Sequence, residues 1–357
     1  MRLLTKFFKK EKAPILHKEG KKIPSFCLLV VNKQCNFHCR MCNMWKHTED
    51  PSSLTLDEMK QFVSDLRSFV DESIFIHLIG GETLLWPHTV ELAKFITDTG
   101  FKTSITTNGY LIDERMAEQL VNSGMSGIFI SLDSLDEVKH DFIRGMKGSY
   151  ARVMKAIDNL STYRARYYTD TSIGLTFTLM QHNIDEALDF TDWVQENKKI
   201  DSLFFNAVLQ PFDSGEESKN WWQREKYKEI WPHDLDAVHH VIDKLIERKR
   251  NNGSKICNPP EQLRVLKEYF KDPYRFRHNM RIKCTRGDLA PEVNASGDIS
   301  MCFYKEPLGN IRKDNIRDVW FSDAMVRARE HINQCDMECD LAANCFYKIE
   351  NITDYVK

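Results

Sequence analysis

The chain has 357 residues, 42% of them hydrophobic, which is enough for one large globular, soluble domain together with a smaller one. Its 50 basic and 52 acidic side chains leave a formal net charge of -2 and no basic stripe, so nucleic acid is excluded as an expected partner. No apolar run approaches the roughly 20 residues that span a bilayer, so we expect no stable membrane insertion.

Residues 1–24 are predicted to form an N-terminal arm. From about residue 25 to 210, apolar strand-like runs alternate with amphipathic helical patterns, which predicts repeated βα units and a parallel sheet. Thr55 and Glu58 predict a capping box at the start of a helix over Thr55–Val70. The six predicted strands are Phe26–Asn32, Ser73–Ile79, Lys102–Thr106, Gly127–Leu132, Ile173–Leu179 and Ser202–Ala207.

Two further regions follow the βα units. Residues 211–275 are predicted to form connecting helices and a lid, in which Trp221 and Trp222 either line a pocket or pack between helices. Residues 276–357 contain five of the ten cysteines and predict a second, small domain. Tightly grouped cysteines without a secretory signal favour metal ligation in a reducing compartment, so we expect a cytoplasmic protein.

Cys35, Cys39 and Cys42 follow the first predicted strand with Cys-x3-Cys-x2-Cys spacing. Three thiolates bind three of the irons of a [4Fe-4S] cluster and leave one iron open to another ligand. The alternatives are buried free thiols or a structural zinc site with His38 or His47 as the fourth ligand. Such zinc sites are closed and usually use a second, distant cysteine pair, and the neighbouring sequence has no convincing one.

Further polar motifs come directly after the predicted strands, at the rim where βα folds bind ligands. Glycines let the backbone approach a ligand, Glu82 can accept a hydrogen bond from an ammonium group, and the Arg144 guanidinium suits a carboxylate. Taken singly, each polar residue is also explained as a helix cap or a surface pair. The motifs are Gly80-Gly81-Glu82, Thr107-Asn108-Gly109, Ser131-Leu132-Asp133-Ser134, and His140, Arg144 and Gly148-Ser149.

The ordered set of cysteines and motifs resembles the radical S-adenosylmethionine (SAM) superfamily. The resemblance implies an α/β fold, the partial (β/α)6 TIM-like barrel, in which the amino and carboxylate groups of SAM chelate the open iron of the first cluster. Thr83 departs from the family pattern, which usually has proline after the glutamate. The implied cofactor-binding residues are Gly80, Gly81, Glu82, Asn108, Ser131, Asp133 and Arg144.

The C-terminal cysteines resemble the auxiliary-cluster domains called SPASM and, in a shortened form, Twitch. They are Cys284, Cys302, Cys335, Cys339 and Cys345. Five cysteines cannot complete two clusters, so the resemblance implies one auxiliary [4Fe-4S] cluster on Cys284, Cys302 and two of the other three. Zinc would also suit these thiolates. One subtype has an acidic base directly after the second cysteine, where this chain has Phe303, which leaves Tyr304 or Asp298 as alternatives.

The resemblance implies an enzyme in which an electron from a flavodoxin- or ferredoxin-type donor cleaves SAM to a 5′-deoxyadenosyl radical, which abstracts hydrogen from a substrate. The auxiliary cluster would serve an oxidation, whereas a thiol donor, with Cys257 as the candidate, would give an epimerase. Only 34 residues precede Cys35, too few for a leader-binding module, so we expect a sugar- or aminocyclitol-like metabolite. The alternatives are modification of a ribosomal peptide or protein side chain and, in another class, a non-catalytic iron–sulfur carrier or zinc-stabilised scaffold.

Overall fold

The computed structural model describes residues 15–16, 22–48, 51–70, 74–211, 220–289, 291–303, 305–345 and 347–349. Six parallel strands follow one another in chain order across the sheet, and helices connect them, which confirms the predicted partial barrel. The six strands are β3 (Phe26–Asn32), β4 (Phe75–Gly80), β5 (Lys102–Thr107), β6 (Gly127–Ser131), β7 (Ser172–Leu179) and β8 (Ser202–Ala207).

The predicted strand boundaries are confirmed to within one or two residues, and Ser73 lies outside the described residues. The predicted capping box is also confirmed, because the Thr55 side chain accepts from the Glu58 N–H and the Glu58 carboxylate accepts from the Thr55 N–H. The helices between and after the strands are α2 (Leu56–Arg67), α3 (Thr89–Asp98), α4 (Glu114–Asn122), α5 (Glu137–Arg144), α6 (Ser149–Tyr167) and α7 (Ala187–Glu196).

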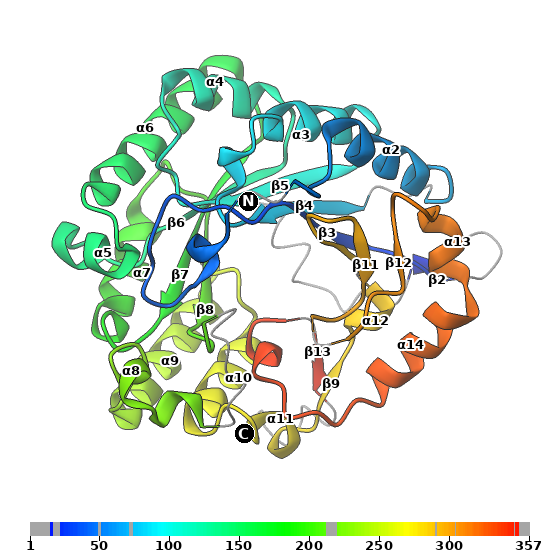
Figure 1. Ribbon diagram of the computed structural model, residues 1–357. Helices are drawn as coiled ribbons and strands as arrows, with labels where there is room; N and C mark the ends of the chain where they lie inside the picture. Colours follow the sequence, from blue (N-terminus) through cyan, green and yellow to red (C-terminus); the bar gives the residue numbers. More distant parts are fainter. Residues whose placement is uncertain are drawn as a thin grey trace.

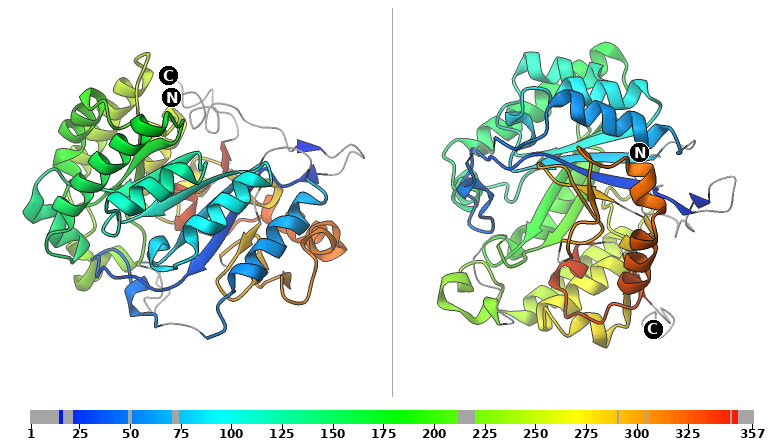
Figure 2. Two further views of the ribbon diagram at one scale, coloured as in Figure 1. Left: turned by 90° about the horizontal axis from the view of Figure 1, so that it is seen from above. Right: turned by 45° about the vertical axis from the view of Figure 1, so that its right-hand side comes forward.

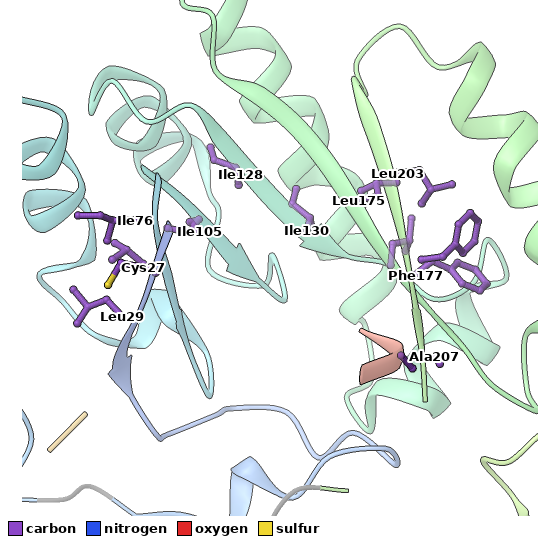
Figure 3. Packing of buried hydrophobic residues seen from close by; sticks show 14 of the residues in the cluster. Cys27, Leu29, Ile76, Ile105, Ile128, Ile130, Leu175, Phe177, Leu203 and Ala207 are labelled. Carbon is purple, nitrogen blue, oxygen red and sulfur yellow. The ribbon is translucent and has the colours of Figure 1, made fainter. Parts of the chain in front are cut away.

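Each strand has an outer face, which packs against the helices, and an inner face, which lines the lumen of the barrel. Side chains alternate between the two faces along a strand. The outer face is apolar and fully buried, with Leu29, Ile76, Ile105 and Leu175 at 0% exposure, and Figure 3 shows part of this layer. Burial of this layer is the main source of stability for the helix ring in Figure 1.

The inner face is more polar. The partly exposed His77 of β4 lies there, between Leu28 of β3 and Ser104 of β5 in the sheet register. The His77 ring bonds to the hydroxyls of Ser104 at 2.7 Å and Thr106 at 3.0 Å. A polar inner face inside an apolar shell suits a compartment for a ligand.

The region after β8 forms packed helices. Trp221 is fully buried and makes edge contacts with Tyr227 and Trp231, which supports the packing interpretation for this tryptophan over the pocket-lining one. The helices are α8 (Glu225–Lys228), α9 (Leu235–Arg250), α10 (Pro260–Lys271) and α11 (Phe276–Asn279). Among the residues described, no helix combines the length and apolarity needed to cross a bilayer.

The C-terminal segment joins both edges of the barrel sheet. Strand β10 (Glu292–Val293) pairs in parallel with β3 and is continued by β11 (Asp298–Ser300) and β12 (Gly309–Asn310). At the other edge, the Asn344 side-chain amide bonds to both backbone groups of Ala207 in β8. The segment therefore crosses the open side of the barrel, as Figures 1 and 2 show.

The remaining C-terminal elements lie along this segment. They are β9 (Ile282–Cys284), α12 (Arg286–Leu289), α13 (Ile316–Phe321), α14 (Asp323–Asn333) and β13 (Tyr347–Ile349), and the short strands β1 (Ile15–Leu16) and β2 (Lys22–Ile23) pair near the N-terminus. The domain boundaries at residues 24, 210 and 275 stay predictions.

Candidate functional site

The three N-terminal cysteines lie on a loop that follows the carboxyl end of β3. Cys39 is 9% exposed, while Cys35 and Cys42 are half-buried. The Phe37 N–H donates to Cys35 Sγ and the Met44 N–H donates to Cys42 Sγ, each at 3.5 Å. Backbone N–H groups that donate to sulfur tune iron–sulfur clusters, so the loop already carries hydrogen bonds of the kind a cluster would receive.

Two glycines allow this loop to pack closely against the barrel. A Cβ at Gly81 would lie 2.1 Å from the Gln34 carbonyl oxygen, and one at Gly145 would lie 2.2 Å from the His38 carbonyl oxygen. Gly145 also has φ +60°, at the left-handed C-cap of α5. Its role was missed from the sequence, where only its place directly after Arg144, near the end of a helix, could have suggested it.

Arg144 and Asp133 form a buried ion pair beside the loop. Their Nη2 and Oδ2 atoms lie 2.6 Å apart, and Arg144 Nη1 lies 4.0 Å from Cys39 Sγ. Burial raises the pKa of Cys39 to about 12 and that of Cys35 to about 11, although Arg144 lowers both. Ligation by these thiols must therefore release protons.

Glu82 lies at the predicted place, directly after β4, and its carboxylate bonds to three groups of the chain. Its carboxylate accepts from the Thr107 hydroxyl at 2.6 Å and from the Asn108 N–H at 2.7 Å, and Leu84 N–H donates to it at 3.0 Å. The residue is 2% exposed. These three donors of the chain hold the β4 and β5 ends together, and the contact of Glu82 with a cofactor ammonium stays a prediction.

The other predicted cofactor contacts gather at the same rim. Gly80 and Gly81 are partly exposed at the end of β4, and Asn108 donates to Asn36 Oδ1 of the cysteine loop at 2.8 Å. Ser131, at the end of β6, is 8% exposed. Asp133 is fully buried, accepts from the Thr178 N–H and pairs with Arg144, and its contact with the cofactor stays a prediction.

Four C-terminal cysteines form a second group. Cys345 interacts electrostatically with Cys284 and Cys302, and Cys339 does so with Cys302 and Cys345. Burial raises the pKa of Cys345 to about 11, an effect that its hydrogen bond with Arg286 opposes. These thiols come from separate places along the C-terminal segment, with Cys284 at the end of β9, and interact with one another across it.

Cys335 lies apart from that group. Arg277 Nη1 donates to Cys335 Sγ at 3.5 Å and to the Met337 carbonyl at 2.7 Å. Cys335 also lines a cavity of about 520 Å³ with Tyr274 and Met337, to which none of the other four cysteines contributes. The choice of ligands among Cys335, Cys339 and Cys345 stays a prediction.

Within the described part of the chain, no group of three or more His, Cys, Asp or Glu side chains is arranged to hold one metal ion. A zinc ion would require four ligands at about 2.0–2.3 Å from a single point.

Two weaker candidates, Cys257 and Asp298, are engaged by other parts of the chain. Cys257 is 3% exposed and its N–H bonds to Leu203, near the start of β8, at the end of the barrel opposite the cysteine loop. The Asp298 carboxylate is occupied by Asn294 and Asn310 in a turn. Tyr304 lies outside the described residues.

Comparison with known proteins identifies the family. Residues 29–194 match the Radical SAM superfamily, and residues 284–346 match SPASM, an iron–sulfur cluster-binding domain. Fe-coproporphyrin III synthase of Methanosarcina barkeri is 30% identical over 85% of this chain and 78% of its own length. The sporulation killing factor maturation protein SkfB of Bacillus subtilis is 23% identical over 92% and 70%.

A solved structure has the same fold. Streptococcus suis SuiB bound to SAM superposes with a TM-score of 0.62 at 17% identity, covering 84% of this chain and 66% of SuiB. This chain therefore spans about two thirds of the length of SuiB. It belongs to the radical SAM superfamily, as an enzyme that acts by radical chemistry with SAM, a SAM-binding [4Fe-4S] cluster and an auxiliary iron–sulfur cluster in a SPASM domain.

Proposed function

We propose that this enzyme modifies a side chain of a ribosomal peptide or of a protein. One observation carries the proposal: both cysteine groups border the same polar lumen. The cysteine loop lies at its rim, and the second cysteine group lies at its open side. Relatives that are named as peptide maturases, such as SkfB, support the peptide alternative better than the sugar or aminocyclitol that the sequence suggested.

Cys35, Cys39 and Cys42 would hold the SAM-binding cluster. When bound, the cluster and SAM supply a radical that removes a hydrogen atom from the substrate. Backbone N–H groups donate hydrogen bonds to the sulfurs of Cys35 and Cys42. The loop also packs closely against Gly81 and Gly145, so these contacts hold it in place before any cluster binds. A preorganised loop reduces the ordering cost of ligation.

The rim residues would bind SAM mainly through backbone and cationic groups. Gly80 and Gly81 leave the backbone accessible for an ammonium group, and Ser131 offers a hydroxyl. Arg144 has a buried Nε without a hydrogen-bond partner among the described residues, and its cation faces the site of the cluster. Asp133 fixes that guanidinium, so Arg144 stays charged in a buried site.

Cys284, Cys302, Cys339 and Cys345 would hold the auxiliary cluster, which leaves Cys335 outside it. Two observations support this choice. The four proposed ligands interact electrostatically with one another, and Cys335 instead accepts a hydrogen bond from Arg277. Arg286, which bonds to Cys345, adds a positive charge beside the proposed ligands. A low-potential donor of flavodoxin or ferredoxin type would supply electrons to the first cluster.

An iron porphyrin is the second candidate substrate, because a relative of comparable length is named Fe-coproporphyrin III synthase. The experiment is to incubate the reconstituted enzyme with dithionite and SAM, adding in turn deuterated peptides from the source organism, Fe-coproporphyrin III, or an aminocyclitol. A peptide substrate predicts that deuterium enters 5′-deoxyadenosine only with the peptides. Stimulation of 5′-deoxyadenosine formation by the porphyrin or the aminocyclitol alone would overturn the proposal. A Cys35/Cys39/Cys42 alanine variant is the control.

A further inference from the structure

Glu292 is a buried acid on the lumen face of the barrel that the proposed function does not use. Its register partners are Leu28 on β3 and Ser300 on β11, and Leu28 in turn pairs with His77. Paired residues of neighbouring strands point to the same face of the sheet, so Glu292 shares the face of His77. Two strand spacings, about 10 Å, separate their backbones. Glu292 therefore lies in the compartment where a substrate would sit.

Arg286 connects Glu292 to the proposed auxiliary ligands. Its Nη2 pairs with Glu292 Oε2, its Nε donates to the Met301 carbonyl at 3.0 Å, and it also bonds to Cys345. Both members of the ion pair are nearly buried, with side-chain exposures of 5% and 6%. One guanidinium thus contacts the lumen acid and an auxiliary cysteine together.

The second carboxylate oxygen of Glu292, Oε1, has no hydrogen-bond partner among the residues described. Arg286 from α12 pairs with the carboxylate, and Cys27 from β3, whose thiol pKa is raised by burial, interacts with it electrostatically. His77 from β4 lies two strands away on the same face, and the register partners Leu28 and Ser300 are uncharged. Burial raises the pKa of Glu292 to about 7, although Arg286 lowers it. A carboxylate of this kind can take and release a proton near neutral pH.

We propose that Glu292 is the proton acceptor of the reaction compartment and that Arg286 couples its protonation to the auxiliary cluster. This inference rests on the proposed function. After hydrogen abstraction, a substrate carbon radical next to an O–H or N–H group loses the proton of that group to Oε1. The auxiliary cluster, when bound, would supply the one-electron oxidant for the electron that remains on carbon, so that a C=O or C=N bond would form. Glu292 thereby favours an oxidation over an epimerisation.

The test is a redox titration of the auxiliary cluster in the reconstituted holoenzyme, followed by electron paramagnetic resonance at several pH values. Glu292→Gln keeps the shape and an acceptor for Arg286 but cannot titrate. The matched control is Asp298→Asn, an acid of the same hairpin whose carboxylate is engaged by Asn294 and Asn310 and does not pair with Arg286. We expect the midpoint of the wild type and of the control to fall as pH rises from about 6 to 8, and the midpoint of Glu292→Gln to be independent of pH.

Infrared spectroscopy of the unmutated enzyme supplies a second readout. A protonated carboxyl band should grow as pH falls from about 8 to 6 and should be absent from Glu292→Gln. With a turned-over substrate, the oxidised product should fall by about 100-fold or more in that variant. A wild-type midpoint independent of pH, or one that keeps its pH dependence in Glu292→Gln, would overturn the inference. Loss of SAM cleavage in the wild type would instead overturn the proposed function.

Discussion

The two cysteine groups of this enzyme are built in different ways. Cys35, Cys39 and Cys42 lie within eight residues on one loop, which is backed by glycines and tied to the barrel by Asn108. The auxiliary cysteines lie at separate places between residues 284 and 345, on a segment that crosses from one sheet edge to the other. The first group depends on local spacing, and the second depends on the completed fold.

That difference explains why the ligands of the first group can be predicted from the sequence, whereas those of the second group cannot. A local loop has its ligands set by spacing, whereas a site assembled from distant turns has them set by tertiary packing. We therefore expect the first group to bind its cluster even when the C-terminal segment is changed. The second group should lose its cluster whenever that segment detaches from the sheet edges.

The largest expected effect is the replacement of Cys39 by alanine. SAM cleavage should fall by more than about 100-fold, because even residues that only support a metal ligand cost 10–100-fold when they are removed. The auxiliary cluster should keep its iron, since its ligands lie on another segment. Iron content and 5′-deoxyadenosine formation measure the two effects, and loss of iron from both groups would contradict their independence.

Cys335→Ala and Cys339→Ala form a matched pair within the second group. Cys335→Ala should keep about eight irons per chain, whereas Cys339→Ala should lose the auxiliary cluster and keep about four. Iron analysis and Mössbauer spectroscopy distinguish these results. The reverse pattern would show that Cys335 is a ligand and that the proposed set is wrong.

Gly145→Ala tests the packing behind the first loop. The added Cβ would lie 2.2 Å from the His38 carbonyl at a left-handed φ, so we expect a loss of roughly 2–5 kcal/mol in unfolding free energy and weaker cluster binding. Gly148→Ala is the control, because Gly148 has φ +78° but nothing within 4 Å of its Cβ position. It should cost about 1–2 kcal/mol. Equal losses of unfolding free energy in both variants would mean that the close contact between Gly145 and His38 does not contribute to stability.

His140 should make the barrel sensitive to acid. It is fully buried, its Nδ1 accepts from the Asp133 N–H, and burial lowers its pKa to about 3. A lowered histidine pKa favours the neutral form, so stability falls as pH drops below about 6.5, where the unfolded chain takes up a proton. The loss by pH 5 should be about 2 kcal/mol. Denaturant unfolding of His140→Asn at pH 7 and 5 should show a smaller loss, and an unchanged loss would contradict this account.

The smallest effect concerns the ion pair between α2 and the C-terminal segment. Arg312 donates to both oxygens of Glu58, at 2.6 and 3.1 Å, and this hydrogen bonding lowers the pKa of Glu58 to about 2. Its stabilisation is present above about pH 4.5 and is lost as pH falls toward 2. Because the pair is about one-third exposed, Glu58→Gln should cost less than about 1 kcal/mol, and less still in high salt. A loss that is insensitive to salt would show that the pair is desolvated.

The sequence predicted the six strands, the capping box and the cluster motif, because alternating hydrophobicity, cap residues and close cysteine spacing are local properties. It could not predict that Glu82 turns toward Thr107 and Asn108, that Asp133 anchors Arg144, or that Cys335 faces Arg277. Those outcomes depend on which buried donors lie nearby once distant strands pair. Glu292 was missed for the same reason, since only the parallel pairing of β10 with β3 brings it to the lumen.

The most direct test of the central claim is to reconstitute the protein without oxygen, count its iron and zinc, and then add dithionite and SAM. The account predicts about eight irons per chain, no stoichiometric zinc, and formation of 5′-deoxyadenosine. About four irons together with zinc would reduce the C-terminal group to a structural role. An iron-replete, reduced sample that neither binds SAM nor forms 5′-deoxyadenosine would contradict the claim that both cysteine groups serve radical chemistry.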